Sequence, residues 1–265
     1  MGIVIATSTR YKAGDPAAEL RAKMALRTFT SAFDLGYRVF AVDSGSDEGW
    51  LSVAKQTGVV LLEEDVLAVG VHSMGRSRRQ AISEAMNCGN PKVVVYIDPE
   101  KYPFVEGGAL EQSALDTIAN DSYASIPRRK DNLKSYPPGQ SAVEIMSNQI
   151  YKQIFEENGF QIPYLDMQMG TKSIGAKGVP YFLNYPGKIG REEHDRWESI
   201  FVPVWQMILE GKKVTSVDVD YIHPKEQTLF EQDNIEFSAK RAEQTAILIG
   251  ACINTVDSYK SILLK

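Results

Sequence analysis

The sequence contains few cysteines and histidines, and it lacks a long hydrophobic run. Its 265 residues include 2 cysteines and 3 histidines. Cys88 and Cys252 are too few for a disulfide framework, and their spacing does not match a zinc site. The longest apolar run extends from Ala246 to Ile253, whereas a membrane span needs about 20 residues. These features exclude a disulfide-stabilised module, a cysteine-ligated zinc domain and a membrane-spanning helix.

Acidic residues slightly outnumber basic ones, 34 to 29, and no basic stripe runs along any segment. The formal net charge is -5 and the isoelectric point is about 5.4. The densest basic run, Arg128 to Lys130, is followed at once by Asp131. A general nucleic-acid surface is therefore not expected.

The beginning of the sequence carries no basic region before its first apolar stretch. Met1 to Ile5 enters an expected strand directly, which argues against a signal peptide. The chain is 43% hydrophobic and 24% charged, as in ordinary globular proteins. We therefore expect a soluble, cytoplasmic protein with reduced thiols, and peripheral membrane contact stays open.

Short apolar runs alternate with amphipathic segments in the first part of the chain. The run from Val93 to Ile97 has no polar interruption and is typical of a strand buried on both faces. Alternation of strands and helices predicts parallel pairing with right-handed crossovers. Strands are expected at 3–6, 37–42, 59–62 and 93–97, and helices at 16–35, directly after the turn at 43–49, and at 74–86.

Three of these expected strands end in polar clusters, at 7–10, 43–46 and 98–100. The carboxyl ends of parallel strands lie at one edge of a sheet, where open α/β proteins bind ligands. Asp98-Pro99-Glu100 places two carboxylates beside a proline that ends the strand. Carboxylate oxygens are preferred by hard divalent cations. Each cluster alone could be an ordinary charged turn, but their coincidence at one edge predicts a site.

The second half of the sequence is less regular. Helices are expected at 110–119, 142–157, 197–209 and 234–264, strands at 123–126, 181–183 and 214–222, and a polar loop at 127–140. No segment has the composition of a linker. We therefore expect a single α/β domain over residues 1–265, with a mostly parallel central sheet and helices on both faces.

Several motifs follow one another in an order found in a known family. Residues 42–49 (VDSGSDEG) are similar to a V-D-D-G-S-x-D-G segment, and residues 75–82 (GRSRRQAI) to a glycine-then-Arg-Asn helix. Residues 98–100 stand where a D-x-D metal motif would, and residues 166–172 are similar to a later acidic-glycine segment. Over 3–104, and more thinly over 164–223, the chain resembles nucleotide-sugar glycosyltransferases of the GT-A fold, family 2-like or mannosylglycerate-synthase-like.

This resemblance implies how the domain is divided and what it binds. Residues 1–104 would be a nucleotide-binding half, 105–232 an acceptor-side half and 233–265 a C-terminal helix. The partners would be a UDP- or GDP-linked sugar and a hydroxyl acceptor. The cofactor would be Mg²⁺ or Mn²⁺.

The resemblance also implies a set of metal ligands. Asp98, Glu100 and a late histidine, His223, would hold the cation. Glu100 departs from the usual second aspartate, so the structure must show whether its longer side chain can serve. For His223, a surface or packed histidine is the alternative. His72 and His194 have no evident partners, and we expect them to be structural or exposed.

The nucleotide would contact the strand ends and the helix at 74–86. Asp43 would accept a hydrogen bond from the base or ribose, although a turn-capping carboxylate is the alternative. At least one arginine of this helix should face the diphosphate, since a guanidinium fork suits phosphate. The residues predicted to bind the nucleotide are Thr7, Arg10, Asp43, Arg76, Arg79 and Asp98.

On the acceptor side, Asp166 is the predicted catalytic residue. It would act as a base or bind the acceptor hydroxyl, and a loop carboxylate without such a role is the alternative. The residues predicted to accompany it are Tyr136, Gln140, Gln168 and Lys172.

The sequence thus favours a metal-dependent glycosyltransferase that moves a hexose to a small or lipid-linked hydroxyl. A nucleotidyltransferase of related fold is one alternative, but Ala6 to Arg10 lacks the glycine-rich loop of that class. A catalytically inactive nucleotide-sugar-binding or assembly protein is the other. The long helix expected at the C-terminus also leaves a homo-oligomer open.

Overall fold

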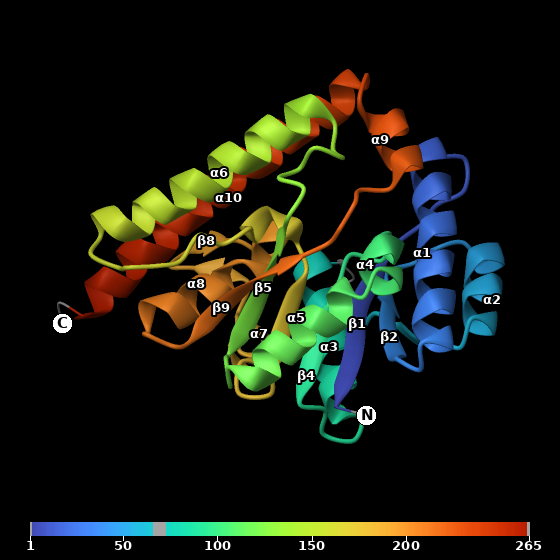
Figure 1. Cartoon of the computed structure of the whole chain (residues 1–265), viewed down its shortest axis with the longest axis horizontal. Coiled ribbons are helices and arrows are strands. Elements are labelled where there is room, and N and C mark those ends of the chain that lie inside the picture. The colour runs from blue at the N-terminus through green and yellow to red at the C-terminus, as the bar shows by residue number, and fades with distance from the viewer. Residues whose placement is uncertain (1, 66–72, 264–265) are drawn as a thin grey trace.

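The computed structural model describes residues 2–65 and 73–263, which form a seven-stranded sheet between helical layers (Figure 1). The strand order is β3-β2-β1-β4-β6-β5-β9. The strands are β1 (Ile3–Thr9), β2 (Arg38–Asp43), β3 (Val60–Glu63), β4 (Val93–Tyr96), β5 (Ala124–Arg129), β6 (Lys172–Gly175) and β9 (Val214–Val219). A small hairpin of β7 (Lys188–Ile189) and β8 (Glu192–Glu193) lies outside this sheet.

Helices cover both faces of the sheet. They are α1 (Pro16–Asp34), α2 (Glu48–Gln56), α3 (Met74–Asn87), α4 (Tyr102–Glu106), α5 (Ala109–Ala119), α6 (Pro138–Glu157), α7 (Val179–Leu183), α8 (Val202–Leu209), α9 (Lys225–Glu231) and α10 (Ile235–Leu263). Two short 3-10 helices, η1 (Met167–Met169) and η2 (Trp197–Ile200), complete the described elements.

The pairing of the strands follows the predicted alternation. β1 pairs in parallel with β2 and β4, with Ile5 opposite both Val39 and Val95. β2 also pairs in parallel with β3, and β5 with β9, while β6 runs antiparallel between β4 and β5. The sheet is therefore mostly parallel, as predicted, and the carboxyl ends of β1, β2 and β4 share one edge.

Side chains of the central strands alternate between two hydrophobic cores. On β4, Val94 and Tyr96 belong to one core and Val93 and Val95 to the other, and none of the four is more than 1% exposed. Residues of α3, α7, α8 and α10 join the first core, and residues of α1, α4 and α5 join the second. Burial on both faces explains why this strand is an uninterrupted apolar run in the sequence.

Helices α6 and α10 lie side by side along the top of the molecule (Figure 1). In α10 the buried residues Leu248, Ala251, Cys252 and Val256 recur at helical spacing. Cys252 is buried and Cys88 half-buried, and both are free thiols, as predicted. Among the described helices, none combines the length and apolar character needed to span a bilayer.

Several expected elements were wrong in type or extent. Residues 181–183 are not a strand but belong to helix α7, which has a proline in its first turn. The expected helix at 197–209 is divided into η2 and α8. The expected polar loop at 127–140 is shorter, because β5 continues to Arg129 and α6 begins at Pro138. Strand β6 and helix α4 were not expected at all.

Candidate active site

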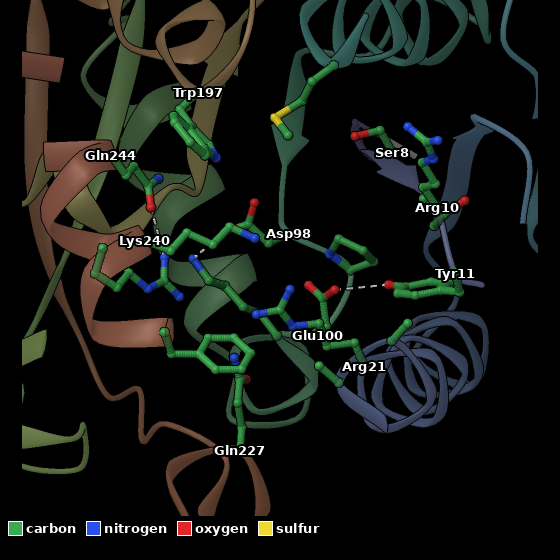
Figure 2. Close-up of a pocket in the computed structure, with 18 of the residues that line it drawn as sticks. Ser8, Arg10, Tyr11, Arg21, Asp98, Glu100, Trp197, Gln227, Lys240 and Gln244 are labelled. Carbon is green, nitrogen blue, oxygen red and sulfur yellow. Dashed lines mark hydrogen bonds and ion pairs between the residues drawn. The ribbon is translucent and has the colours of Figure 1, made fainter. Parts of the chain in front are cut away.

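A polar cleft of about 620 Å³ opens where β1 and β4 end, between α1, α3, α6 and α10 (Figure 2). Arg10 and Tyr11 follow β1, Asp98 and Glu100 follow β4, and Ser44 follows β2; all five line the cleft. Parallel pairing brings these turns together although Tyr11 and Glu100 are 89 residues apart in the chain. All three polar clusters of the sequence thus contribute to one cavity.

Each carboxylate of the D-P-E turn (Asp98 to Glu100) has a partner at the cleft wall. The hydroxyl of Tyr11 donates a 3.1 Å hydrogen bond to Glu100 Oε1, and Arg21 of α1 lies near the same carboxylate (Figure 2). Lys101 Nζ lies 3.0 Å from Asp98 Oδ2 and also donates to a carbonyl at the end of η1. The turn is therefore held in place from two sides.

The two carboxylates differ in how well their charge is compensated. Burial raises the pKa of Glu100; Arg21 opposes this effect, and the neighbouring Asp98 adds to it. Burial alone would also raise the pKa of Asp98, but Lys101 and Arg78 outweigh it and lower that pKa. Glu100 is therefore the carboxylate that would gain most from a further positive charge.

His223 lines the same cleft with one ring nitrogen anchored. Its Nδ1 lies 2.8 Å from the hydroxyl of Thr228, which donates to the carbonyl of Ser135 at 2.9 Å. When the hydroxyl proton goes to that carbonyl, Nδ1 carries the ring proton and Nε2 keeps its lone pair. Burial, followed by Arg241 and other nearby cations, lowers the pKa of His223 from 6.5 to about 3. A neutral imidazole with its second nitrogen anchored is the form that binds metals.

This donor set fits a cation that shares its coordination with a phosphate. Mg²⁺ at nucleotide sites usually takes one or two carboxylates, with phosphate oxygens and water in the remaining positions. Asp98 and Glu100 offer such carboxylates, and His223 adds a nitrogen. Within residues 2–65 and 73–263, no three His, Cys, Asp or Glu side chains form a complete metal site by themselves. Asp98, Glu100 and His223 line the same cleft, but they do not form such a group, so metal binding by these three residues stays a prediction.

Two residues predicted to bind the nucleotide lie behind the cleft wall. Thr7 is buried and donates to a carbonyl in the turn after β4 at 2.8 Å. Asp43 accepts hydrogen bonds from Thr9 Oγ1 at 2.8 Å and from the backbone N–H of Ser46 at 2.7 Å. It therefore caps its own turn, which was the alternative that the sequence left open. Arg10 lines the cleft, and contact of any of these residues with a nucleotide stays a prediction.

Of the three arginines in α3, Arg78 is the one among the cleft-lining residues. Its Nε donates to the hydroxyl of Tyr96 at 2.9 Å, and its Nη1 donates to a carbonyl just before η2 at 3.0 Å. Arg79 instead forms a bidentate contact with Asp195, at 2.5 and 3.1 Å. The prediction that Arg76 and Arg79 bind the nucleotide stays untested, and Arg78 is the arginine of this helix that lines the cleft.

Three of the predicted acceptor-side residues line the cleft, namely Tyr136, Gln140 and Gln168. The ring of Tyr136 packs against the imidazole of His223, with 4.0 Å between their centroids. Gln168 Nε2 donates to the hydroxyl of Tyr151 at 2.9 Å, which ties η1 to α6. The first contact places the predicted acceptor-side residue Tyr136 directly beside His223.

Asp166, the predicted catalytic residue, lies behind this wall and is 2% exposed. Arg129 donates to both of its carboxylate oxygens, at 2.6 and 2.7 Å, and Asn148 donates to Oδ1 at 2.9 Å. Burial acts to raise the pKa of Asp166, but Arg129 outweighs burial and lowers it. A base role would require Arg129 to release this carboxylate, so that role stays a prediction that the geometry does not favour.

Lys172 is fully buried in β6, away from the cleft lining. Its Nζ donates to the carbonyl of Met167 at 3.1 Å and lies 5.0 Å from the ring centroid of Phe201. Burial, with a smaller effect of Lys101, lowers the pKa of Lys172 to about 7. In this position Lys172 supports η1 from behind, and direct contact with an acceptor stays a prediction.

His194 is not among the residues that line the cleft. His194 is 8% exposed, and its Nδ1 lies 3.3 Å from Glu198 Oε1, which fits the expected structural role. His72 lies outside the described residues.

Sequence reasoning missed several charged residues of the cleft. Arg21 from α1, and Lys240 and Arg241 from α10, bring positive charge to it (Figure 2). Glu144 from α6 lines it and is 5% exposed. No motif marks these positions, because each is one charged residue on a helix that carries others. Glu144 could have been found from its spacing, since it follows the predicted Gln140 by one helical turn.

No known protein family and no curated protein matches the chain by sequence. Solved structures do match its fold. Glucosyl-3-phosphoglycerate synthase from M. tuberculosis aligns with a TM-score of 0.57 at 11% identity, over 94% of this chain and 80% of that chain. The same enzyme with Mn²⁺, uridine diphosphate and phosphoglyceric acid gives 0.52 at 12% identity, over 94% and 78%. A further mycobacterial protein gives 0.54 at 13% identity, over 94% and 74%.

At sequence identities this low, the role of a residue in those proteins does not identify the role of a residue in this chain. The TM-scores above 0.5 over 94% of this chain show that the overall fold is shared. As its motifs predict, the chain has the GT-A fold of the nucleotide-sugar glycosyltransferases.

Proposed function

We propose that this chain is a metal-dependent glycosyltransferase that moves a hexose from a UDP- or GDP-linked sugar to a small hydroxyl acceptor. The main support is that the D-P-E turn, Arg78 and His223 meet in one cleft of a GT-A fold. The structural neighbours add support for the donor class, because they were crystallised with Mn²⁺ and uridine diphosphate or its glucose derivative.

In this proposal the diphosphate lies between the D-P-E turn and Arg78. Asp98, Glu100 and His223 would hold Mg²⁺ or Mn²⁺, which when bound neutralises charge on the departing diphosphate. Arg78 would bind a phosphate oxygen with a guanidinium that is already fixed by Tyr96 and by backbone carbonyls. Because these side chains would already be in position, they would need little rearrangement when negative charge develops on the departing diphosphate.

The acceptor in this proposal carries an anionic group. Lys240 and Arg241 of α10 lie in the cleft with Arg21 of α1. Burial lowers the pKa of Lys240, and Arg21 and Arg241 lower it further, because positive charge is crowded here. A carboxylate or phosphate on the acceptor would relieve this crowding. The phosphoglyceric acid in a structural neighbour is an acceptor of this kind.

A nucleotide-sugar-binding protein without catalysis is the second candidate. The observation in its favour is the 3.0 Å contact between Lys101 and Asp98, because an ammonium group in this place competes with a metal ion. If the contact persists when a nucleotide binds, the cleft would hold the diphosphate without a cation.

Turnover of defined substrate pairs tests the proposal. The donors would be UDP-glucose, UDP-galactose, GDP-glucose and GDP-mannose, and the acceptors 3-phosphoglycerate and glycerate, each with Mn²⁺ or with EDTA. We expect one pair to release nucleoside diphosphate only with metal. Glu100→Ala should reduce that rate at least about 100-fold while circular dichroism stays unchanged. Binding without turnover would support the second candidate, and a preference for triphosphates would support a nucleotidyltransferase.

A further inference from the structure

Arg129 lies between two carboxylates, and its single charge can balance only one of them. Asp166 binds two nitrogens of the guanidinium, Nε at 2.7 Å and Nη2 at 2.6 Å. The third nitrogen, Nη1, lies 2.8 Å from Glu144 Oε2. Asp166 therefore accounts for the charge of Arg129, and Glu144 leaves a surplus negative charge at the cleft wall.

Glu144 also has unused capacity to accept a hydrogen bond. Its Oε1 accepts a 2.7 Å hydrogen bond from Gln140 Nε2. Its Oε2 is buried and accepts no hydrogen bond from the described residues, since the contact with Arg129 is an ion pair without hydrogen-bond geometry. A buried carboxylate oxygen in this state gains free energy from a new donor. Glu144 lines the cleft, so a hydroxyl bound there could supply that donor.

A short segment joins Glu144 to the D-P-E turn. Gln168 lines the cleft beside Glu144, and its side chain donates to Ser147 on the next turn of α6 at 3.2 Å. Two residues later, a Cβ at Gly170 would lie only 2.6 Å from Asp98 Oδ2. Glu144 of α6 and the turn after β4 thus line the same cleft, and the segment from Gln168 to Gly170 contacts both α6 and that turn.

We propose that Glu144 is a catalytic residue that receives the proton of the acceptor hydroxyl. This inference rests on the proposed function. The hydroxyl oxygen forms a bond to the anomeric carbon, and the bond from that carbon to the phosphate oxygen breaks. The diphosphate leaves with the electron pair, and the hydroxyl proton passes to the Glu144 carboxylate. Gln140 and Arg129 hold the carboxylate in position for this transfer.

Glu144 suits this role better than Asp166 for two reasons of geometry. Asp166 does not line the cleft, whereas Glu144 does. Both oxygens of Asp166 accept hydrogen bonds from Arg129, whereas Glu144 keeps one oxygen without any. A base must reach the hydroxyl within hydrogen-bond distance, and of these two carboxylates Glu144 is the one at the cleft surface.

Glu144→Gln tests the proposal, because it removes the charge and basicity while keeping the shape of the side chain. Glu157→Gln is a matched control, since Glu157 is exposed on the same helix and accepts a 2.7 Å hydrogen bond from Gln153, one turn earlier. With the substrate pair that wild type turns over, we expect kcat of Glu144→Gln to fall by about 100-fold or more. Glu157→Gln should match wild type. Titration calorimetry should give the same affinity for uridine or guanosine diphosphate with Mn²⁺ in all three proteins.

Glu144→Asp distinguishes a role of Glu144 in catalysis from a role in folding stability. It keeps the charge near Arg129 but withdraws the carboxylate from the cleft by one methylene, so kcat should fall while thermal stability stays near wild type. A rate within threefold of wild type in Glu144→Gln would overturn this proposal and leave the proposed function standing. A reduced diphosphate affinity in parallel with kcat would also overturn it, because the residue would then act in structure. Absence of turnover of every pair by wild type would end both proposals.

Discussion

At the scale of single residues, the polar groups around the cleft are held mostly by partners distant in sequence. Tyr11 donates a hydrogen bond to Glu100, and Arg129 pairs with Asp166, whereas the partner of Asp98, Lys101, is only three residues away. The sequence marked the carboxylates, because they follow strand ends in recognisable motifs. It did not mark their partners, because a tyrosine or arginine carries no signal of which carboxylate it will meet. Roles that depend on these partners, such as that of Asp166, were therefore the least predictable.

Lys172 allows a pH prediction at this scale. Its pKa is about 7 in the folded protein, against an ordinary value of 10.5 for a solvated lysine, so the unfolded chain binds the proton more tightly. Between these values the unfolded chain is protonated at this lysine and the folded chain is not, so stability rises with pH. The slope from this group is at most about 1.4 kcal/mol per pH unit. Below pH 7 Lys172 is protonated in both the folded and the unfolded chain. The free-energy cost of burying its positive charge then lowers the stability in full.

Lys172→Met removes this dependence, and urea unfolding between pH 7 and pH 9 measures it. We expect wild type to gain stability relative to Lys172→Met as the pH rises, by at most about 1.4 kcal/mol per pH unit. Lys152→Met is the control, because Lys152 is partly exposed and pairs with Glu156 on the surface of α6. Parallel stability curves for wild type and Lys172→Met would show that the buried amine keeps an ordinary pKa.

At the scale of elements, long apolar runs and amphipathic helices were predictable, and short segments were not. β4 and α1 were recognised because continuous hydrophobicity and helical spacing are strong signals. Residues 181–183 were assigned to a strand because three apolar residues have no readable period, and in the structure they form part of α7. β6 was missed because Lys172 and Ser173 are polar residues buried by their neighbours in the sheet.

The turn that leads from η1 to β6 gives a prediction at this scale. Gly170 has a φ of 78°, and a Cβ there would lie 2.6 Å from Asp98 Oδ2 and 3.2 Å from Lys101 Nζ. Gly170→Ala should therefore displace the Asp98 carboxylate and weaken binding of uridine diphosphate with Mn²⁺ about tenfold or more, a loss of about 1.4 kcal/mol in binding free energy. Titration calorimetry measures this effect directly.

Gly211→Ala is the matched control for this substitution. Gly211 has a φ of 68°, but a Cβ there would meet nothing within 4 Å. Both variants should lose about 1 kcal/mol of folding stability from backbone strain, and only Gly170→Ala should lose affinity. Equal affinities in the two variants would show that Asp98 does not need its present position to bind the ligand.

At the scale of the whole molecule, the topology was predictable in the first half and only in outline in the second. Alternating strands and helices predict the parallel pairing found among β1, β2, β3 and β4, but they do not by themselves give the order β3-β2-β1-β4. The position of β6 between β4 and β5, and of α10 at the cleft, depends on contacts between distant segments. Lys240 and Arg241 reach the cleft only through that packing, so the charge of the acceptor side was not readable from sequence.

A prediction for the whole molecule concerns the binding of metal and nucleotide together. Because no described group of three acidic, histidine or cysteine side chains completes a metal site, Mn²⁺ alone should bind weakly. A diphosphate would supply the missing oxygens, so metal and nucleotide should each strengthen the binding of the other by the same factor. We expect a coupling of about tenfold, or 1.4 kcal/mol. The thermal shift with uridine or guanosine diphosphate and Mn²⁺ together should then exceed the sum of the separate shifts.

Glu100→Ala decides whether this coupling passes through the D-P-E turn. Glu100 is the carboxylate whose pKa is raised by burial and by Asp98, so it should bind the cation most favourably when a second positive charge arrives. In Glu100→Ala the joint shift should fall to the sum of the separate ones, while the shift from nucleotide alone should persist through Arg78. Additive shifts in wild type would mean that the nucleotide binds without sharing a cation. The Lys101 contact with Asp98 would then be the permanent counter-charge of the site, as a binding protein without catalysis requires.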